Sequence, residues 1–212
     1  MMSWWIRGAL ASALVLATAC GSSVTENGTG GAGGTGGTGG GTAGTGGDGG
    51  AIPPQCAVET SEQGPYNVKI RFENNGAFPA FLRKDCALQY TIESCADDYS
   101  APVATRTFCS QACGTPNGCI VCGACPQESV QLDVGANTAD TWTGMRYTFG
   151  TTPEGCSCHE EHVAQAGRYR IRVPVYASEM DAQTGTPAYE VTMNFELPAP
   201  NGAVNVLIGQ SP

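Results

Sequence analysis

Apolar and polar residues alternate in several segments of the chain after residue 65. In the segment 66–73, Val68, Ile70 and Phe72 occupy every second position, and charged residues stand between them. A period of two is typical of a β-strand that buries one face, whereas helical periodicity is nearly absent. The same alternation marks the segments 77–83, 88–92, 130–134, 141–149, 169–175, 189–197 and 204–208. The pattern therefore predicts seven or eight half-buried strands.

Two of these segments depart from strict alternation. Pro79 lies inside the segment 77–83, and a proline there suits an edge strand or a bulge. In the segment 141–149, Trp142 has the opposite parity to the apolar residues that follow it. A bulge at Gly144 would bring these side chains onto one face of a single strand.

The spacing of strands and turns indicates the fold class. Turns rich in Gly, Pro and Asn join the strands, and a single turn at His159–Gln165, ended by Gly167, is the only helix that we expect. Residues 55–212 are numerous enough to bury a core as one domain. We therefore predict an all-β domain over 55–212, an antiparallel immunoglobulin-like β-sandwich of 7–8 strands stabilised by disulfides.

Short motifs from Val130 onward occur in a recognisable order. They are Leu132-Asp133-Val134-Gly135, Trp142-Thr143-Gly144 and Gly167-Arg168-Tyr169. This order resembles the small bacterial β-sandwiches of the intracellular-proteinase-inhibitor type. The resemblance implies the sandwich fold and, as an alternative function, inhibition of a proteinase. The cysteines between positions 109 and 125 have no counterpart in that family.

The N-terminus has the features of an export signal. Arg7 precedes an apolar run over 8–19, which is too short to span a membrane and ends at Cys20. These residues resemble a bacterial lipoprotein signal, although Leu16 stands one place earlier than that family prefers, so ordinary signal cleavage is an alternative. The resemblance implies removal of residues 1–19, lipidation of Cys20 and, from Gly21, the outer membrane of a Gram-negative cell.

The segment that follows is a linker by composition. Half of the 30 glycines lie between Gly28 and Gly50, and Val24 is the only larger aliphatic residue in the stretch 21–50. Such a sequence cannot bury enough apolar surface to offset the entropy of ordering. We expect a flexible tether over residues 20–54, with a root-mean-square span of about 30 Å for 30 residues.

Composition and charge exclude several function classes. The chain has 10 basic and 19 acidic residues, a net charge of −9, which does not favour nucleic-acid binding. Two histidines and 14% charged residues leave little material for acid–base chemistry. No catalytic motif is recognisable, so we expect neither an enzyme nor a cofactor. Eleven cysteines indicate an oxidising compartment.

The cysteines are expected to form disulfides. Without Cys20 an even number remains, which suits five bridges. They are Cys56, Cys86, Cys95, Cys109, Cys113, Cys119, Cys122, Cys125, Cys156 and Cys158. Cys86 and Cys95 flank an extended segment and should not pair with each other. Cys156 and Cys158 are too close in sequence to pair, so each should reach into the 109–125 loop, and reduction should unfold the domain.

Metal binding and thiol redox chemistry are the alternatives for these cysteines. Cys119, Cys122 and Cys125 have the spacing of metal ligands. Zinc could take a fourth ligand from Cys156, Cys158, His159 or His162. His159 and His162 could also bind a metal weakly on a helical turn, although a solvated loop is the simpler interpretation. Because exported thiols are normally oxidised, we expect no metal.

Three arginines form the most suggestive binding feature. Arg168, Arg170 and Arg172 would lie on one face of a strand and could bind sulfate, phosphate or an acidic polysaccharide. Cross-strand pairing with Glu190 and Glu196 is the simpler interpretation.

Together these patterns predict a lipid-anchored envelope protein that carries a binding or structural module without catalysis. Its expected partners are the membrane, through the anchor, and an unidentified protein or polysaccharide of the envelope. The domain would lie in the periplasm or at the cell surface.

Overall fold

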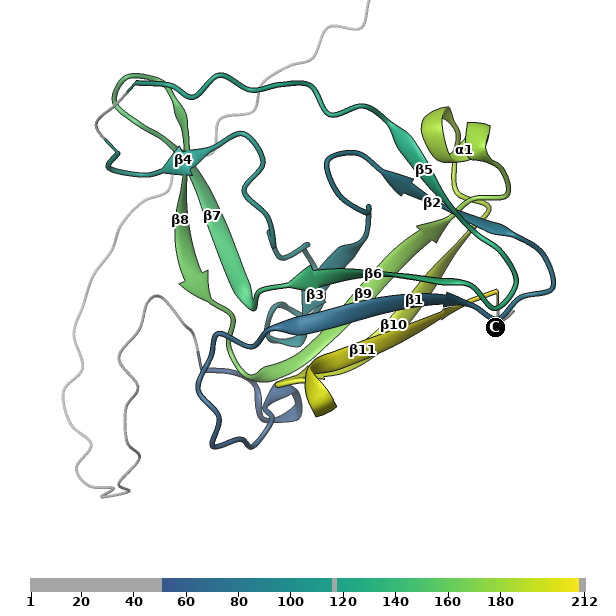
Figure 1. Cartoon of the computed structure of the whole chain (residues 1–212). Coiled ribbons are helices and arrows are strands. Elements are labelled where there is room, and N and C mark those ends of the chain that lie inside the picture. The colour runs from purple at the N-terminus through teal and green to yellow at the C-terminus, as the bar shows by residue number, and fades with distance from the viewer. Residues whose placement is uncertain (1–50, 116–117, 210–212) are drawn as a thin grey trace, which may run out of the picture. The chain divides into compact units, whose positions relative to one another are not determined.

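The computed structural model describes residues 51–115 and 118–209, which fold into an all-β domain with very little helix (Figure 1). The strands are β1 (Val68–Asn74), β2 (Ala80–Lys84), β3 (Thr91–Ser94), β4 (Gln111–Ala112), β5 (Glu128–Leu132), β6 (Asn137–Trp142), β7 (Met145–Thr151), β8 (Ser157–Val163), β9 (Gly167–Val175), β10 (Tyr189–Leu197) and β11 (Ala203–Ile208). The helical elements are α1 (Glu179–Thr184) and the short 3-10 turns η1 (Pro54–Cys56), η2 (Cys95–Asp97) and η3 (Pro200–Gly202).

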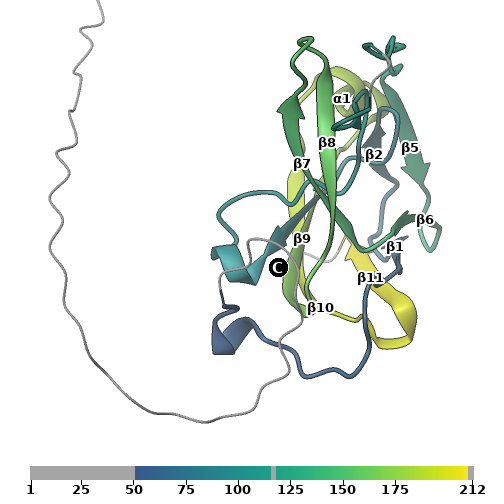
Figure 2. The ribbon, with the colours of Figure 1, turned by 90° about the vertical axis from the view of Figure 1, so that its left-hand side faces the viewer.

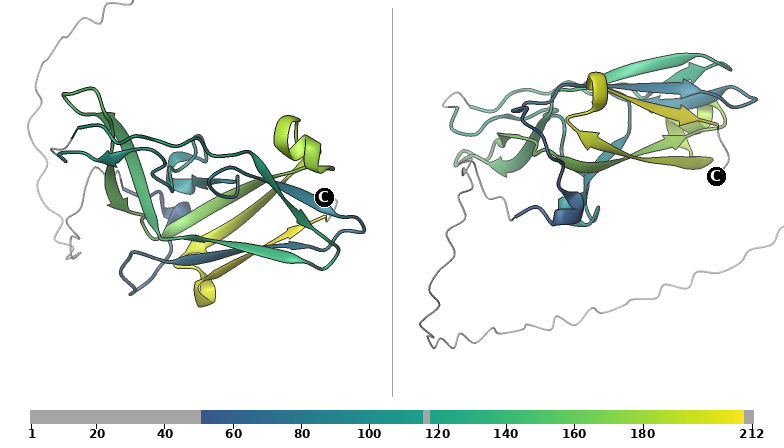
Figure 3. Two further views of the ribbon diagram at one scale, coloured as in Figure 1. Left: turned by 45° about the horizontal axis from the view of Figure 1, so that its top comes forward. Right: turned by 90° about the horizontal axis from the view of Figure 1, so that it is seen from below.

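Two three-stranded sheets form the sandwich and enclose the core. One has the order β11–β1–β6 and the other β10–β9–β3, and Figure 3 shows them as two layers. Every second residue of β9, from Gly167 to Val175, is buried, as the alternation predicts. Trp142 is enclosed near the centre, with its ring edge-on to Tyr169 at a centroid distance of 5.5 Å. The predicted β-sandwich class is confirmed.

The sheets differ in detail from the expected antiparallel set. The described residues contain eleven strands in four sheets, because the short strands β2 and β5 pair separately and β7, β8 and β4 form a further sheet. Two of the pairs, β1 with β11 and β4 with β8, are parallel. Parallel neighbours arise here between segments far apart in sequence, which residue alternation cannot detect.

The helical turn predicted at His159–Gln165 is wrong. Residues Ser157–Val163 form β8, which pairs antiparallel with β7 along its whole length. The α-helix among the described residues is α1, where the Ser178 hydroxyl accepts a hydrogen bond from the Asp181 amide and caps the first turn. Cross-strand hydrogen bonds thus override the weak local preference of a short, charged segment.

The single strand predicted over 141–149 is also wrong, because the chain turns at Gly144. The φ angle of Gly144 is +73°, and a Cβ atom there would collide with the backbone of Tyr66. Only glycine satisfies both conditions. The strand therefore ends at Trp142 in the sandwich, and β7 begins in a different sheet, where Phe149 is 52% exposed instead of facing the core.

The hairpin β7–β8 projects from the sandwich (Figure 2), and together with the loops at 107–115 and 118–127 it contains seven of the ten cysteines of the domain. We call residues 107–115, 118–127 and 145–163 the Cys-rich lobe. Its strand β4 pairs with β8, and disulfides tie its loops to this hairpin and to the region after β2. The lobe buries few large apolar side chains.

Candidate binding groove

A groove of about 930 Å³ opens at one side of the sandwich. It lies along Tyr189–Met193 of β10 and is also lined by Asn205 and Leu207 of β11 and by Gly209, which follows that strand. Both β10 and β11 are outermost strands of their sheets, so the groove lies where two sheet edges face outward. Its volume is near the upper end of the range of small-molecule sites.

The groove follows from a loss of burial along β10. Phe195 and Leu197, near the connection to β11, are buried, whereas Val191 and Met193 are only partly buried although they pack against the same core cluster. Tyr189, at the start of the strand, is 41% exposed. The inward face of β10 is therefore covered by the opposite sheet over only half of its length.

One wall of the groove includes Asn74, whose side chain fixes the turn beside it. Its side-chain amide donates to the carbonyl oxygens of Phe78 and Leu132 at 2.9 and 2.8 Å, and its Oδ1 accepts from the Gly76 amide at 2.9 Å. This buried side chain is thus fully paired and shapes the turn between β1 and β2. The turn presents Phe78, which is 80% exposed, at the rim.

The lining is almost free of charge. Glu190 is its only charged residue, and its carboxylate lies 3.0 Å from the Arg172 guanidinium. Burial raises the pKa of Tyr189 above its usual value, so its hydroxyl is neutral at physiological pH. A groove with these walls favours an uncharged, apolar ligand over a sugar acid or a phosphate.

The ten cysteines of the domain form five disulfides, as predicted. The pairs are Cys56–Cys95, Cys86–Cys125, Cys109–Cys122, Cys113–Cys158 and Cys119–Cys156. Their Cα atoms lie 4.9–5.5 Å apart, within the usual range. Cys86 and Cys95 bond other cysteines and not each other. Cys158 of β8 and Cys156 just before it both bond cysteines of the 109–125 loop, so these predictions are confirmed.

The same pairing removes the thiolates that the zinc and redox alternatives require. Cys119, Cys122 and Cys125 each bond a different partner. Within 51–115 and 118–209, no three His, Cys, Asp or Glu side chains are grouped as a metal ion requires. The structure thus offers no support for a site built from these three cysteines.

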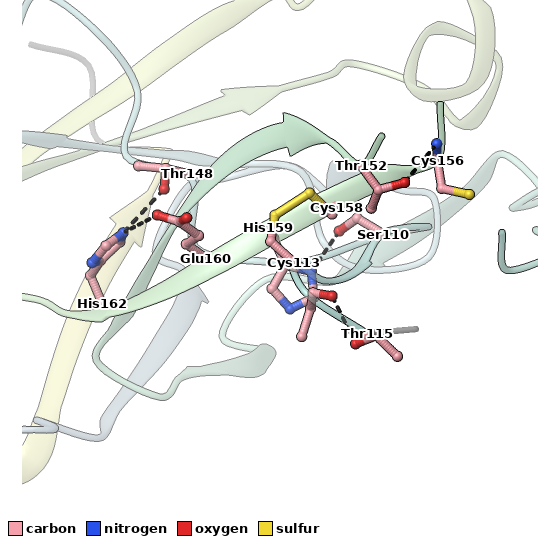
Figure 4. The surroundings of a disulfide bond; sticks show 11 residues. Ser110, Cys113, Thr115, Thr148, Thr152, Cys156, Cys158, His159, Glu160 and His162 are labelled. Atoms are coloured by element: carbon pink, nitrogen blue, oxygen red, sulfur yellow. Dashed lines mark hydrogen bonds and ion pairs between the residues drawn. A yellow bond between two sulfur atoms is a disulfide. The ribbon is translucent and has the colours of Figure 1, made fainter. Parts of the chain in front are cut away.

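The two histidines lie on β8 and make hydrogen bonds to hydroxyl groups (Figure 4). The Nδ1 atom of His159 lies 2.8 Å from the Ser110 hydroxyl, and the Nε2 atom of His162 lies 3.1 Å from the Thr148 hydroxyl. Ser110 is buried beside the Cys113–Cys158 disulfide, away from the groove. These contacts tie the lobe's strands together and do not form a catalytic triad.

The three arginines of β9 are neutralised by carboxylates. Arg168 pairs with Glu196 at 3.4 Å and Arg172 with Glu190, as the cross-strand interpretation predicts. The residue that the sequence did not reveal is Glu93 of β3. Its carboxylate is buried and lies within hydrogen-bond distance of both Arg170 and Arg172, at 2.6 and 3.2 Å.

Comparisons of this chain with protein-family models, with curated proteins and with solved structures give no match. The resemblance to proteinase inhibitors therefore rests on its three short motifs, two of which meet where Trp142 contacts Tyr169. Cys20 and the tether up to residue 50 lie outside the described residues. The described part of the chain contains no helix that could span a membrane.

Sequence reasoning found the strand residues of the groove but not the groove itself. Tyr189, Val191 and Met193 were assigned to the inward face of a strand from their alternation. Which strand covers that face depends on how the two sheets overlap, and alternation carries no information on this.

Proposed function

We propose that this protein is a lipid-anchored binding protein of a Gram-negative cell envelope, which binds a ligand in the groove and catalyses no reaction. The observation that carries the proposal is the groove itself, an apolar hollow of about 930 Å³ beside two free sheet edges. A purely structural module has no need of such a hollow, since closing it would bury Val191 and Met193 and stabilise the fold.

The anchor and the tether support the location. The lipoprotein-type signal ending at Cys20 and the Gly-rich tether would hold the domain on a membrane while leaving it free to turn. We expect Cys20→Ser to move the protein from the membrane fraction to the soluble exported fraction. A wild-type protein that is already soluble and begins at a residue other than Cys20 would contradict the anchor.

The groove is tested with Nile red, a neutral dye that fluoresces in apolar sites. We expect the purified domain to bind it, and Met193→Glu to weaken binding at least tenfold, because a carboxylate would stand among apolar walls. The matched control is Asn194→Glu, one residue further on the solvent face of the same strand. Absence of dye binding, or equal loss in both variants, would reject the groove as a ligand site.

A separate observation favours proteinase inhibition as a second candidate. Residues 118–124 are all exposed, Val121 is 99% exposed, and no backbone hydrogen bond joins this stretch to other described residues. Disulfides at Cys119 and Cys122 hold the stretch on both sides of Ile120 and Val121. An exposed, pre-organised backbone is what a proteinase cleft binds.

An assay with an elastase-type serine proteinase tests this candidate. We expect inhibition by the wild-type domain and its loss in Val121→Asp, with Thr115→Asp outside the exposed stretch as the control. Rapid, complete proteolysis at the loop without inhibition would reject it.

A further inference from the structure

Among the strands that the structure describes, β10 is at the edge of its sheet, and this edge lacks the proline, lysine or bulge that commonly blocks pairing with another strand. Its nine residues pair with β9 in continuous register, without a bulge. Its sequence, YEVTMNFEL, contains neither Pro nor Lys, and its inward positions carry no charge. Soluble proteins usually protect a long edge with such residues, because the unpaired N–H and C=O groups otherwise recruit other chains. An unprotected edge of this length is therefore itself a candidate for strand pairing.

The apolar groove lies directly beside this edge. Tyr189, Val191 and Met193 direct their side chains to the inner face of the sheet, and the first is exposed while the others are only partly buried. In β9, the neighbouring strand, the corresponding residues Val175, Val173 and Ile171 are fully buried. The sandwich thus has the burial pattern of a fold that lacks one strand next to β10.

We infer that an extended segment of a partner polypeptide, with aliphatic residues at alternate positions, adds to β10 as an extra strand and fills the groove with its inward side chains. This inference rests on the proposed function and specifies its ligand class. Main-chain hydrogen bonds to β10 supply affinity, and the groove selects the aliphatic side chains. The contact length over Tyr189–Met193 is five residues, or about 16 Å of extended chain.

The charges and the chain's own composition favour a separate aliphatic partner. Glu190, the one charged residue of the lining, is already paired with Arg172, so the partner needs no charge inside the groove. The chain's own tether is a poor occupant, because in residues 21–50 only Val24 is a larger aliphatic residue. Filling a groove of about 930 Å³ requires several such side chains.

The experiment uses a fluorescein-labelled peptide of sequence Lys-Thr-Val-Thr-Val-Thr-Val-Lys and measures its binding to the purified exported protein by fluorescence anisotropy. Two partner peptides carry N-methyl groups, one on its threonines and the other on its valines, which removes one set of N–H donors and leaves the side chains unchanged. Alternate N–H groups of a strand face opposite edges, so one of these two sets points to β10 whichever direction the peptide takes. We expect binding of the first peptide, a loss of at least tenfold for one of the two N-methylated peptides with little loss for the other, and a loss of at least tenfold in Met193→Glu but not in Asn194→Glu. Hydrogen exchange should slow at the amides of Tyr189–Met193 when the first peptide is bound.

The outcomes separate this inference from the function on which it rests. If Nile red binds the groove but the first peptide does not bind, strand addition is wrong and the groove remains a ligand site. Equal binding of all three peptides, or competition by palmitate with no change in exchange along β10, also overturns strand addition and indicates an apolar cavity ligand. If neither the dye nor the peptide binds, the proposed function fails as well.

Discussion

The sandwich and the Cys-rich lobe are both made of β-strands, yet different forces hold them together. In the sandwich, β9 buries five of its nine residues, and twenty buried residues form one apolar cluster. In the lobe, none of the seven residues of β7 is buried, and β8 buries only Cys158. The lobe depends instead on the Cys109–Cys122, Cys113–Cys158 and Cys119–Cys156 bridges and on the bridge from Cys125 to Cys86.

This contrast shows two ways to offset the entropy of ordering a chain. Burying apolar surface stabilises the folded state, at roughly 25 cal/mol per Å². A disulfide acts mainly on the unfolded chain by removing conformations that it could otherwise reach. The lobe can therefore leave Val121 and Phe149 exposed, whereas the strands of the sandwich must alternate buried and exposed residues.

The largest expected effect is that of reduction. The five bridges close loops with sequence separations from 13 to 45 residues. Each contributes about 3 kcal/mol on the chain-entropy account, and their sum is comparable to the whole stability of a typical domain. We expect full reduction to unfold both regions, monitored by the fluorescence of Trp142, the only tryptophan after residue 5. A native Trp142 spectrum in the reduced protein would mean that the apolar core suffices for the sandwich.

The same substitution, phenylalanine to alanine, can be made in both regions to compare its effect on the free energy of unfolding. Phe72 is fully buried in β1, whereas Phe149 of the lobe is 52% exposed. We expect Phe72→Ala to lower the free energy of unfolding by about 3–5 kcal/mol, since it removes a core side chain and leaves a cavity. Phe149→Ala should change it by less than about 0.5 kcal/mol. Urea denaturation followed by Trp142 fluorescence measures both, and equal losses would contradict the proposed division of forces.

The ion pairs of Arg168, Arg170 and Arg172 with Glu93, Glu190 and Glu196 form a set that we call the arginine ladder. Two of its glutamates give a smaller contrast within the sandwich. Glu93 is buried and bonds Arg170 and Arg172, whereas Glu190 is exposed and pairs with Arg172 alone. We expect Glu93→Gln to cost about 2 kcal/mol, because it leaves half-buried guanidinium groups short of a charged partner. Glu190→Gln should cost at most about 0.5 kcal/mol. Thermal unfolding of the two variants decides whether the buried carboxylate is the central member of the ladder.

The smallest expected effect appears in alkali. Burial raises the pKa of Tyr90 and of Tyr169 to about 12, in both cases against an opposing arginine charge. Above pH 10 the unfolded chain ionises these tyrosines while the folded one keeps them neutral, so their stabilisation is complete below pH 10 and is lost as the pH rises to 12. At pH 11 the stabilisation from each tyrosine has fallen by about 1.4 kcal/mol. Tyr169→Phe should flatten this pH dependence, as followed by denaturant titration from pH 9 to 11, and an unchanged slope would reject the assignment.

Several features of this protein could be predicted from the residue pattern because they are local or arithmetical. The strands at 68–74, 167–175 and 189–197 follow from alternation, and the five disulfides follow from the even number of cysteines after Cys20. The excluded pairing of Cys86 with Cys95 follows from the length of extended chain between them. Each of these inferences uses distances along the chain only.

The errors lie where a partner element decides the outcome. Residues 157–163 are polar on both faces, so nothing local distinguishes a strand from a helical turn, and pairing with β7 selects the strand. In the sequence, Gly144 suggests a β-bulge. In the structure the Tyr66 backbone packs against its Cα atom and leaves no room for a Cβ atom. Val134, expected to point inward, is exposed because β5 ends at Leu132.

The sequence by itself determined the class of the domain, its disulfide-bonded state and the faces of its main strands. The reason is that the alternation of apolar residues and the number of cysteines can be read directly from the residue types. The tertiary structure alone decided that Glu93 joins the arginine ladder and that the inner face of β10 stays open beside the end of β11. Both depend on which strands become neighbours and how far the two sheets overlap. Strand neighbours and sheet overlap are set by the packing of the complete domain, because strands distant in sequence compete for the same apolar surface.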